Sequence, residues 1–313
     1  MSKTKYIYIC SAGHSGSTLL DLLLGSHSLI ESLGEISHLP KNITLNTQCS
    51  CGETVQSCPM WKAILSDLGE QLHTNLFQNP YALNTGYPEA TTVVDRNKQT
   101  KVYLVIRKFV HGLIYLDHRF GFNMFSGFTR VFKESLNHRF MMYDAVRKYT
   151  HTDIVVDSSK TYLEAISLYR QCPENVRLII LSRDGRGVMY SNMKRQLGRK
   201  NGLVGWMHYY SRVLPLISRH VAKEHTLTVH YEDLANHTEN ELARICDFIG
   251  VDYESAMQNF TSHEHHITNG NDMRFSESSE IRLDTSWQTN LTKDDLDYFE
   301  REAGELSRSL GYK

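Results

Sequence analysis

The chain has no long hydrophobic run and no excess of one charge. Its 313 residues contain no stretch of about 18 consecutive apolar residues, which a membrane-spanning helix needs. With 34 basic and 35 acidic residues the net charge is −1, so no overall field attracts nucleic acid or an anionic membrane surface. We therefore predict neither a nucleic-acid nor a membrane partner. Any anionic ligand must be held by a local cluster of donors.

Proline is scarce as well: six residues are scattered along the chain, and no repeat or low-complexity linker divides it. Residues 1–5 are basic like the start of a secretory signal, but the apolar run behind them ends at Ser11, where polar residues follow. We predict a cytoplasmic protein with a single domain over residues 1–313 and a less regular, acceptor-side insertion at about residues 40–135.

Six cysteines are present, and three of them lie close together in the sequence: Cys49, Cys51 and Cys58. A structural zinc site needs four ligands, and His38 or His73 could complete the set. The spacing matches no familiar ligand pattern, so we assign no metal. A local disulfide or free thiols are the alternatives, between which the sequence does not decide.

A glycine-rich segment, Ser-Ala-Gly-His-Ser-Gly-Ser-Thr at residues 11–18, follows the apolar stretch 6–10 and precedes a leucine-rich stretch at 19–24. This pattern is typical of a buried strand, a tight loop and the first turn of a helix. Backbone N–H groups in such a loop converge at the positive end of the helix dipole and bind phosphate or sulfate. The predicted oxyanion site consists of Gly13, His14, Ser15, Gly16, Ser17 and Thr18.

Farther along, apolar stretches alternate with amphipathic ones. We predict strands at residues 29–33, 153–157, 176–182 and 226–231. We predict helices at residues 102–132, 137–149, 161–170 and 206–223. Two further helices are predicted to begin at about residue 187 and at residue 238, the second with a capping box between Thr238 and Glu241. The alternation predicts an α/β fold with three layers, α/β/α, around a central parallel sheet. Ligands bind at the carboxyl ends of such strands, where residues 13–18, residues 158–160, Arg183 and Tyr231 fall.

A second strand-turn-helix pattern occurs at residues 181–191. Arg183 ends the strand, and Ser191 lies one to two turns into the helix. Together they could bracket one phosphate, the arginine through its forked guanidinium and the serine through its hydroxyl. Taken alone, Arg183 is more simply a surface ion-pair residue. Combined with the glycine loop, it gives two anion sites, as a nucleotide with phosphates on both sides of its ribose requires.

These residues resemble the sulfotransferases that use 3′-phosphoadenosine 5′-phosphosulfate (PAPS). Residues 11–20 resemble the family's 5′-phosphosulfate loop, and residues 181–191 its 3′-phosphate element. The Tyr-Glu-Asp-Leu at 231–234 resembles the segment near the adenine, and residues 265–292 the loop that closes over the cofactor. The resemblance implies a P-loop-NTPase-like fold, PAPS as donor, 3′-phosphoadenosine 5′-phosphate (PAP) as product, and no metal. Besides the glycine loop, it implies that the cofactor is bound by Arg183, Ser191, Tyr231, Asn271, Met273 and Arg274.

The resemblance also implies catalytic roles for Glu35, Lys160 and His14. Glu35 matches the base of tyrosylprotein and some bacterial carbohydrate sulfotransferases, and Lys160 a lysine near the bridging oxygen of the sulfonate. Without the resemblance, Glu35 would be read as a glutamate at the start of a helix. Lys160 would be read as a solvated lysine at a helix start, where the helix dipole disfavours positive charge. His14 stands where many relatives have Arg or Lys. With a pKa near about 6.5, it is fully charged only if a bound anion raises that pKa.

The predicted activity is in-line transfer of a sulfuryl group to a hydroxyl or amine of a small-molecule acceptor, a carbohydrate or natural product, with Glu35 as base. One alternative is a P-loop kinase that acts on a small metabolite; residues 154–157 could serve as a Walker B strand, but no Walker lysine follows Gly16. Another is a nucleotide- or glycan-binding module without turnover. The identity of the acceptor and the oligomeric state, a homo-oligomer included, are not encoded in any pattern of the sequence.

Overall fold

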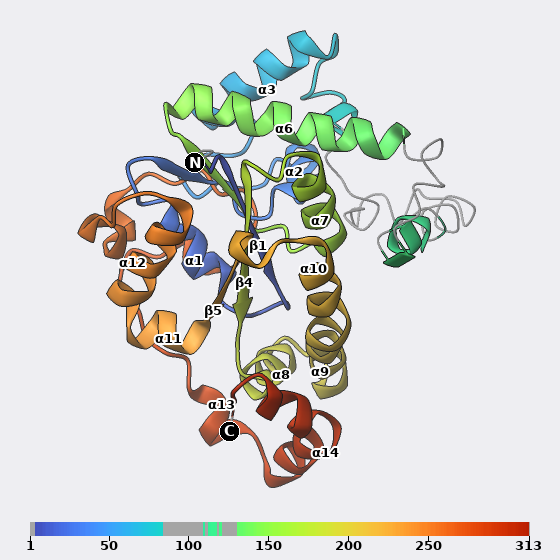
Figure 1. Ribbon diagram of the computed structural model, residues 1–313. Coiled ribbons are helices and arrows are strands. Elements are labelled where there is room, and N and C mark those ends of the chain that lie inside the picture. Colours follow the sequence, from blue (N-terminus) through green and yellow to red (C-terminus); the bar gives the residue numbers. More distant parts are fainter. Residues whose placement is uncertain (1–3, 84–108, 110–111, 118, 121–129, 313) are drawn as a thin grey trace. The chain divides into compact units, whose positions relative to one another are not determined.

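A five-stranded sheet organises the computed structural model, which describes residues 4–83, 109, 112–117, 119–120 and 130–312 (Figure 1). The strand order is β2-β3-β1-β4-β5. The strands are β1 (Tyr6–Ser11), β2 (Ile30–Ser32), β3 (Ile154–Asp157), β4 (Val176–Ser182) and β5 (Thr226–His230). Helices connect strands that pair in parallel, which confirms the predicted α/β fold with a central parallel sheet. Most of the helical stretch predicted at 102–132 lies outside the described residues.

The chain groups into two compact units. Unit 1 comprises Met1–Tyr8, Thr18–Arg177 and Glu254–Ser279, and unit 2 comprises Ile9–Ser17, Leu178–Tyr253 and Glu280–Lys313. After β1 the chain adds β2 and β3 on one side of it, and then β4 and β5 on the other side. The direction in which strands are added therefore reverses at β1. The loop that follows β1 is therefore at the switch point of the sheet, where α/β proteins bind ligands.

In unit 1, β3 pairs with both β1 and β2 in parallel, with Tyr6 opposite Val155 and Ile30 opposite Ile154. The helices are α1 (Ser17–Leu24), α2 (Leu39–Leu45), α3 (Pro59–Gln71), α6 (Arg130–Thr150) and α7 (Tyr162–Gln171). Helix α6 packs on β2 and β3, and α3 runs beside it (Figure 1). The five leucines of α1 are all buried, as the leucine-rich pattern predicts. The glycine loop and the helix after it are thus both predicted by one short stretch of sequence, residues 11–24.

A buried polar network lies within unit 1. Arg139, on α6, has no exposed side-chain surface; its Nη2 donates to Glu164 Oε1 over 2.7 Å, and its Nη1 lies 3.4 Å from Asp157 Oδ2. Tyr143 donates to Asp157 over 2.5 Å and Tyr8 to Glu164 over 2.9 Å. Buried charges are tolerated only when they are paired and hydrogen-bonded in this way. The network fixes the carboxyl end of β3, three residues before Lys160.

In unit 2, β4 and β5 pair in parallel from Leu178 opposite Thr226 to Ser182 opposite His230. Its helices are α8 (Gly185–Lys194), α9 (Arg199–His208), α10 (Leu214–His220), α11 (Tyr231–Asn236), α12 (Thr238–Ile249), α13 (Ser286–Asn290) and α14 (Lys293–Ser309). Within the described parts of both units, no helix is long and apolar enough to cross a bilayer.

Two local predictions in unit 2 need correction. The helix predicted at 206–223 forms as far as His220 but contains a π-helical turn at Tyr209–Val213, just before Pro215, which has no N–H to bond the preceding turn. The capping box predicted at Thr238 does not form. Because α11 ends only two residues earlier, the Thr238 hydroxyl donates to the Leu234 carbonyl over 2.8 Å. A capping box occurs instead at Thr292 and Asp295, at the start of α14.

Replacement of Arg139 by Met should lower the free energy of unfolding by about 3–5 kcal/mol, because two buried carboxylates lose their cation. Urea unfolding measures the change. Lys148→Met, on the exposed face of the same helix, is the matched control and should change stability by less than about 0.5 kcal/mol. Equal losses in the two variants would show that the network has no special role in stability.

Candidate active site

The glycine loop in unit 2 connects β1 to the first residue of α1. His14 has φ +63° and Gly16 φ +92°, both in the left-handed region. A Cβ atom on Gly16 would lie 2.5 Å from the ring of Tyr231, so only glycine lets that ring pack against the loop. Gly13 is exposed, with open space where a Cβ would be. The loop therefore leaves room for a ligand at the start of the helix, where N–H groups lack intrahelical partners.

Arg183 follows β4 directly, and its guanidinium is turned toward this loop. Only 7% of Arg183 is exposed. Its Nη1 donates to the carbonyl of His14 over 3.0 Å, and the guanidinium lies 4.5 Å from the centre of the Tyr231 ring. The structure thus brings together three of the predicted cofactor residues. Ser191 lies two turns into α8 and, within the described chain, makes no hydrogen bond to Arg183.

A carboxylate that the sequence analysis missed occupies the other side of Arg183. Asp284 Oδ2 accepts a hydrogen bond from Arg183 Nη2 over 3.0 Å, and Oδ1 accepts from the Ser286 N–H over 3.1 Å. Burial works to raise the pKa of Asp284, but Ser286 and Arg183 outweigh it and lower the pKa to about 2. Arg183 therefore already holds one anionic group. No sequence pattern links two residues 101 positions apart.

In unit 1, Glu35 and Lys160 form an ion pair, as expected if both act at one site. Glu35 follows Gly34, whose carbonyl accepts a hydrogen bond from the N–H of Ser158 over 2.9 Å. A Cβ on Gly34 would lie 2.7 Å from the carbonyl of Asn269, so glycine allows the C-terminal segment to approach closely. Lys160 has φ +63°, a strained conformation of the kind that clusters at functional sites.

The surroundings of Glu35 keep it ionised. Burial raises its pKa, but the Lys160 ammonium, His38 and the Asn269 amide outweigh burial, so the pKa lies below its usual value. Asn269 Nδ2 donates to Glu35 Oε2 over 3.1 Å, and His38 Nε2 lies 3.6 Å from the same oxygen. Burial lowers the pKa of His38 despite Glu35, so the imidazole is neutral near pH 7. Glu35 can therefore accept a proton at neutral pH.

Asp21 is a second residue that the sequence analysis missed. It is a lone acidic residue among the leucines of α1 and is buried. Its carboxylate accepts hydrogen bonds from Ser158 Oγ over 2.6 Å and from Ser32 Oγ over 2.8 Å. Burial raises its pKa to about 7 against the effect of these hydroxyls. Asp21 thus connects α1 to the end of β2 and to the turn that carries Lys160.

Three of the predicted cofactor residues lie in the C-terminal part of unit 1. The N–H of Asn271 donates to Thr18 Oγ1 over 3.0 Å, and Asn271 Oδ1 accepts from the N–H of Met273 over 3.2 Å. Arg274 Nη1 donates to the carbonyl of Gly270 over 2.7 Å. Its Nε is buried and has no hydrogen-bond partner in the described part of the chain. Asn271 thus lies beside the start of α1, and Arg274 is hydrogen-bonded to the residue that precedes Asn271.

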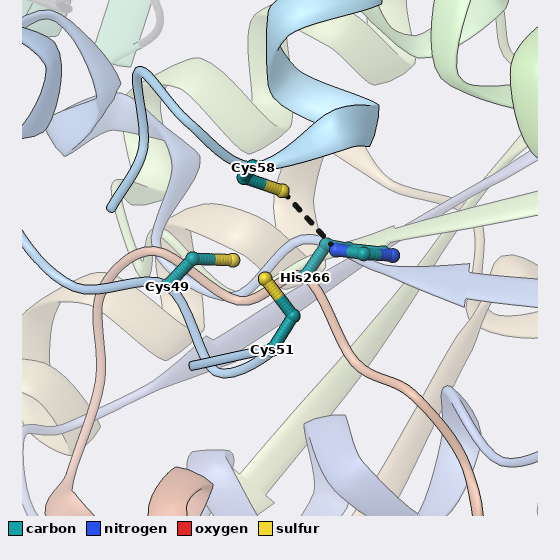
Figure 2. Close-up of side chains that lie close together, drawn as sticks. All are labelled: Cys49, Cys51, Cys58 and His266. Atoms are coloured by element: carbon teal, nitrogen blue, oxygen red, sulfur yellow. Dashed lines mark hydrogen bonds between the residues drawn. The ribbon is translucent and has the colours of Figure 1, made fainter. Parts of the chain in front are cut away.

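The three clustered cysteines are free thiols, and no disulfide joins them. Figure 2 shows their sulfur atoms converging beside the imidazole of His266. Neither His38 nor His73, the histidines considered from the sequence, belongs to this cluster. His38 instead faces Glu35. The sequence spacing did not identify His266, because it lies 208 residues beyond Cys58.

Replacement of Lys160 by Met should destabilise the protein by about 1–3 kcal/mol at pH 7. This loss lies between those typical of exposed and of buried ion pairs, because the pair with Glu35 is partly buried. Because the folded protein lowers the pKa of Glu35, the pair stabilises it fully above the ordinary value of 4.5. That contribution is lost as pH falls through the lowered pKa. The difference in unfolding free energy between wild type and variant should therefore shrink in acid. A difference independent of pH, or an equal loss in the exposed control Lys62→Met, would contradict this assignment.

Comparisons with known proteins address the family. A family model described as "Sulfotransferase family" matches residues 122–255, which include Lys160, Arg183, Ser191 and Tyr231. No curated protein sequence matches the chain.

Solved structures similar to this chain include a sulfotransferase domain that shares its fold. The sulfotransferase domain of the Synechococcus PCC 7002 olefin synthase is 17% identical, with a TM-score of 0.56 and coverage of 100% of this chain and 97% of that one. The sulfotransferase domain from the curacin biosynthetic pathway is 16% identical (TM-score 0.46; 100% and 99% covered). Sulfotransferase STF9 from Mycobacterium avium is 13% identical (TM-score 0.46; 100% and 78% covered). The family model matches residues 122–255, and the chain shares its fold with a solved sulfotransferase domain; both findings agree with the resemblance that the motifs indicated.

Proposed function

We propose that the protein transfers a sulfuryl group from PAPS to a hydroxyl or amine of a small-molecule acceptor. One observation carries the proposal: Arg183, the predicted 3′-phosphate residue, donates a hydrogen bond to His14 in the predicted 5′-phosphosulfate loop. Two segments that are predicted to bind anions and lie far apart in the sequence are thus joined by a hydrogen bond within unit 2. Such a pair suits one nucleotide that carries phosphates on both sides of its ribose.

The residues present fit this donor. The space at Gly13 leaves the loop open to an oxyanion, and the Arg183 guanidinium donates a hydrogen bond to the Asp284 carboxylate, with which a phosphate would compete. The N–H groups of residues 13–17 would hold the 5′ group and Arg183 the 3′-phosphate. Tyr231 lies against both elements. PAPS, when bound, supplies a sulfuryl group activated for transfer by its phosphate leaving group.

The protein's own groups have separate tasks in this proposal. Backbone donors of the loop stabilise the sulfonate oxygens, as fixed donors do in other oxyanion sites. Glu35 accepts the proton of the acceptor hydroxyl or amine at a carboxylate oxygen. Lys160 holds Glu35 deprotonated beforehand, and its ammonium would neutralise charge on the leaving group. His14 would add positive charge once an anion raises its pKa.

The acceptor class, a carbohydrate or natural product, stays a prediction, as do the cytoplasmic location and the single-domain organisation. A panel of sugars, phenols and amines with radiolabelled PAPS tests the activity itself. Sulfation of at least one class supports the proposal. Stabilisation by ATP and magnesium but not by PAP would favour a kinase instead. PAP binding without any sulfated product would favour a binding module.

Arg183→Ala should weaken PAP binding by about 2–3 kcal/mol, or roughly 30- to 150-fold, because a charge-assisted contact to the 3′-phosphate is lost. Asp284→Asn should have the opposite effect and tighten binding by about 3- to 10-fold, because Arg183 no longer shares its charge with a carboxylate. Isothermal titration calorimetry measures both. The exposed Arg195→Ala serves as control. Unchanged PAP affinity in Arg183→Ala would refute the assignment of the 3′-phosphate site.

Glu35→Gln should lower kcat by about 10²–10⁴-fold, the usual contribution of a general base, while PAP affinity stays at the wild-type level. Initial rates with the best acceptor of the panel, together with calorimetry, separate the two effects. Glu53→Gln, an exposed replacement of the same kind, should retain full activity. A fully active Glu35→Gln variant would mean that another group takes the proton.

A further inference from the structure

Four side chains outside the proposed donor site present metal-ligating atoms to one point. Cys49, Cys51, Cys58 and His266 each offer one such atom, and all four atoms lie within 4.8 Å of one another (Figure 2). A tetrahedral zinc ion at about 2.3 Å from sulfur and 2.0–2.1 Å from nitrogen holds its ligand atoms roughly 3.5–3.8 Å apart. Cys58 Sγ and His266 Nδ1 are already 3.3 Å apart. Small side-chain rotations would therefore complete the coordination.

The cysteine loop is shaped before any ion binds. The N–H of Gly52 donates to the carbonyl of Cys49 over 3.0 Å in a tight turn, and Gly52 has φ +91°. This turn places Cys49 and Cys51 side by side in Figure 2. Cys58 is the N-cap residue of α3, where the helix dipole favours a thiolate. Three sulfur ligands are thus arranged by local sequence alone.

The fourth ligand is brought in by hydrogen bonds to that same loop. The N–H of Ser50 donates to the carbonyl of Ile267 over 3.0 Å, and the N–H of Ile267 donates to Ser50 Oγ over 2.8 Å. Trp61 Nε1 donates to the carbonyl of His266 over 2.8 Å. The backbone on either side of the imidazole is therefore fixed.

We propose that Cys49, Cys51, Cys58 and His266 bind one zinc ion. Three sulfur atoms and one imidazole nitrogen form a donor set that favours zinc, and the set is closed because all four ligands come from the protein. Cys49 and Cys58 are fully buried, so an exchangeable site open to solvent is not expected. Binding releases the three thiol protons, whereas His266 binds as the neutral imidazole through Nδ1, and the site carries one net negative charge.

The role of this zinc is structural. It joins residues 49–58 to the segment that continues from His266 to Asn269, whose amide contacts Glu35, and to Asn271, which contacts Thr18. Metal binding therefore stabilises a part of the chain that carries predicted site residues. Such four-ligand sites contribute directly to the free energy of folding. The zinc site does not depend on the identity of donor or acceptor.

Metal analysis of the full chain, expressed with added zinc and purified under reducing conditions, tests the site. Wild type should contain about one zinc per chain, and Cys58→Ser and His266→Ala should each lose most of it. Cys172→Ser and His263→Ala are matched controls outside the cluster and should retain it. Wild type with less than about 0.1 zinc per chain, or equal loss in the controls, would overturn the proposal.

Two further measurements keep the test decisive if the ligand variants fold poorly. His266→Cys replaces one zinc ligand by another and should retain the metal, whereas a merely structural histidine would give no such rescue. Wild type loaded with cobalt should show the visible absorption of a tetrahedral thiolate complex, and a chelator should lower its Tm. A disulfide among the three cysteines under these conditions, or bound iron and sulfide in place of zinc, would refute the assignment.

Discussion

The hydrogen bond from the buried Arg183 guanidinium to the carbonyl of His14 is the contact on which the account depends. It places the residue that ends β4 against the loop that ends β1. The Tyr231 ring, at the end of β5, packs against both, and Gly16 makes that packing sterically feasible. Three parallel strands thus deliver a loop, a cation and an aromatic ring to one place. Arg183 is shared between a backbone carbonyl and the Asp284 carboxylate, so its charge is partly satisfied before a ligand arrives.

Unit 1 has a comparable arrangement around Glu35 and Lys160. Its buried network of Arg139, Glu164 and Asp157 fixes the end of β3, and Asp21 holds the turn that follows through Ser158. These polar groups are expensive to bury and are tolerated because each is paired. Lys160 is held in a left-handed conformation by this scaffold. The ion pair keeps Glu35 deprotonated, the form that can accept a proton. The same ion pair lowers the pKa of Glu35 and so makes it a weaker base.

Sequence reasoning succeeded where local chemistry dictates structure. The apolar run 176–182 became β4 with the predicted bounds, and the glycine pattern gave a strand, a loop and a helix. It failed where a residue depends on a distant partner. Asp284, Asp21 and His266 carry no periodic pattern, and each gains its meaning from contacts across 101, 137 and 208 positions. Pro215 is a local signal for the π-helical turn before it, whereas no local signal indicates that the Thr238 hydroxyl donates to the Leu234 carbonyl instead of capping α12.

The central claim is that two anion sites in contact recognise the placement of phosphates on a nucleotide, and calorimetry with PAP and ADP tests it most directly. Both ligands carry two phosphate groups on adenosine, but only PAP places one on the 3′ position. If Arg183 binds the 3′-phosphate, PAP should bind about 10- to 100-fold more tightly than ADP in the absence of added metal. Equal affinity for the two nucleotides would contradict the account.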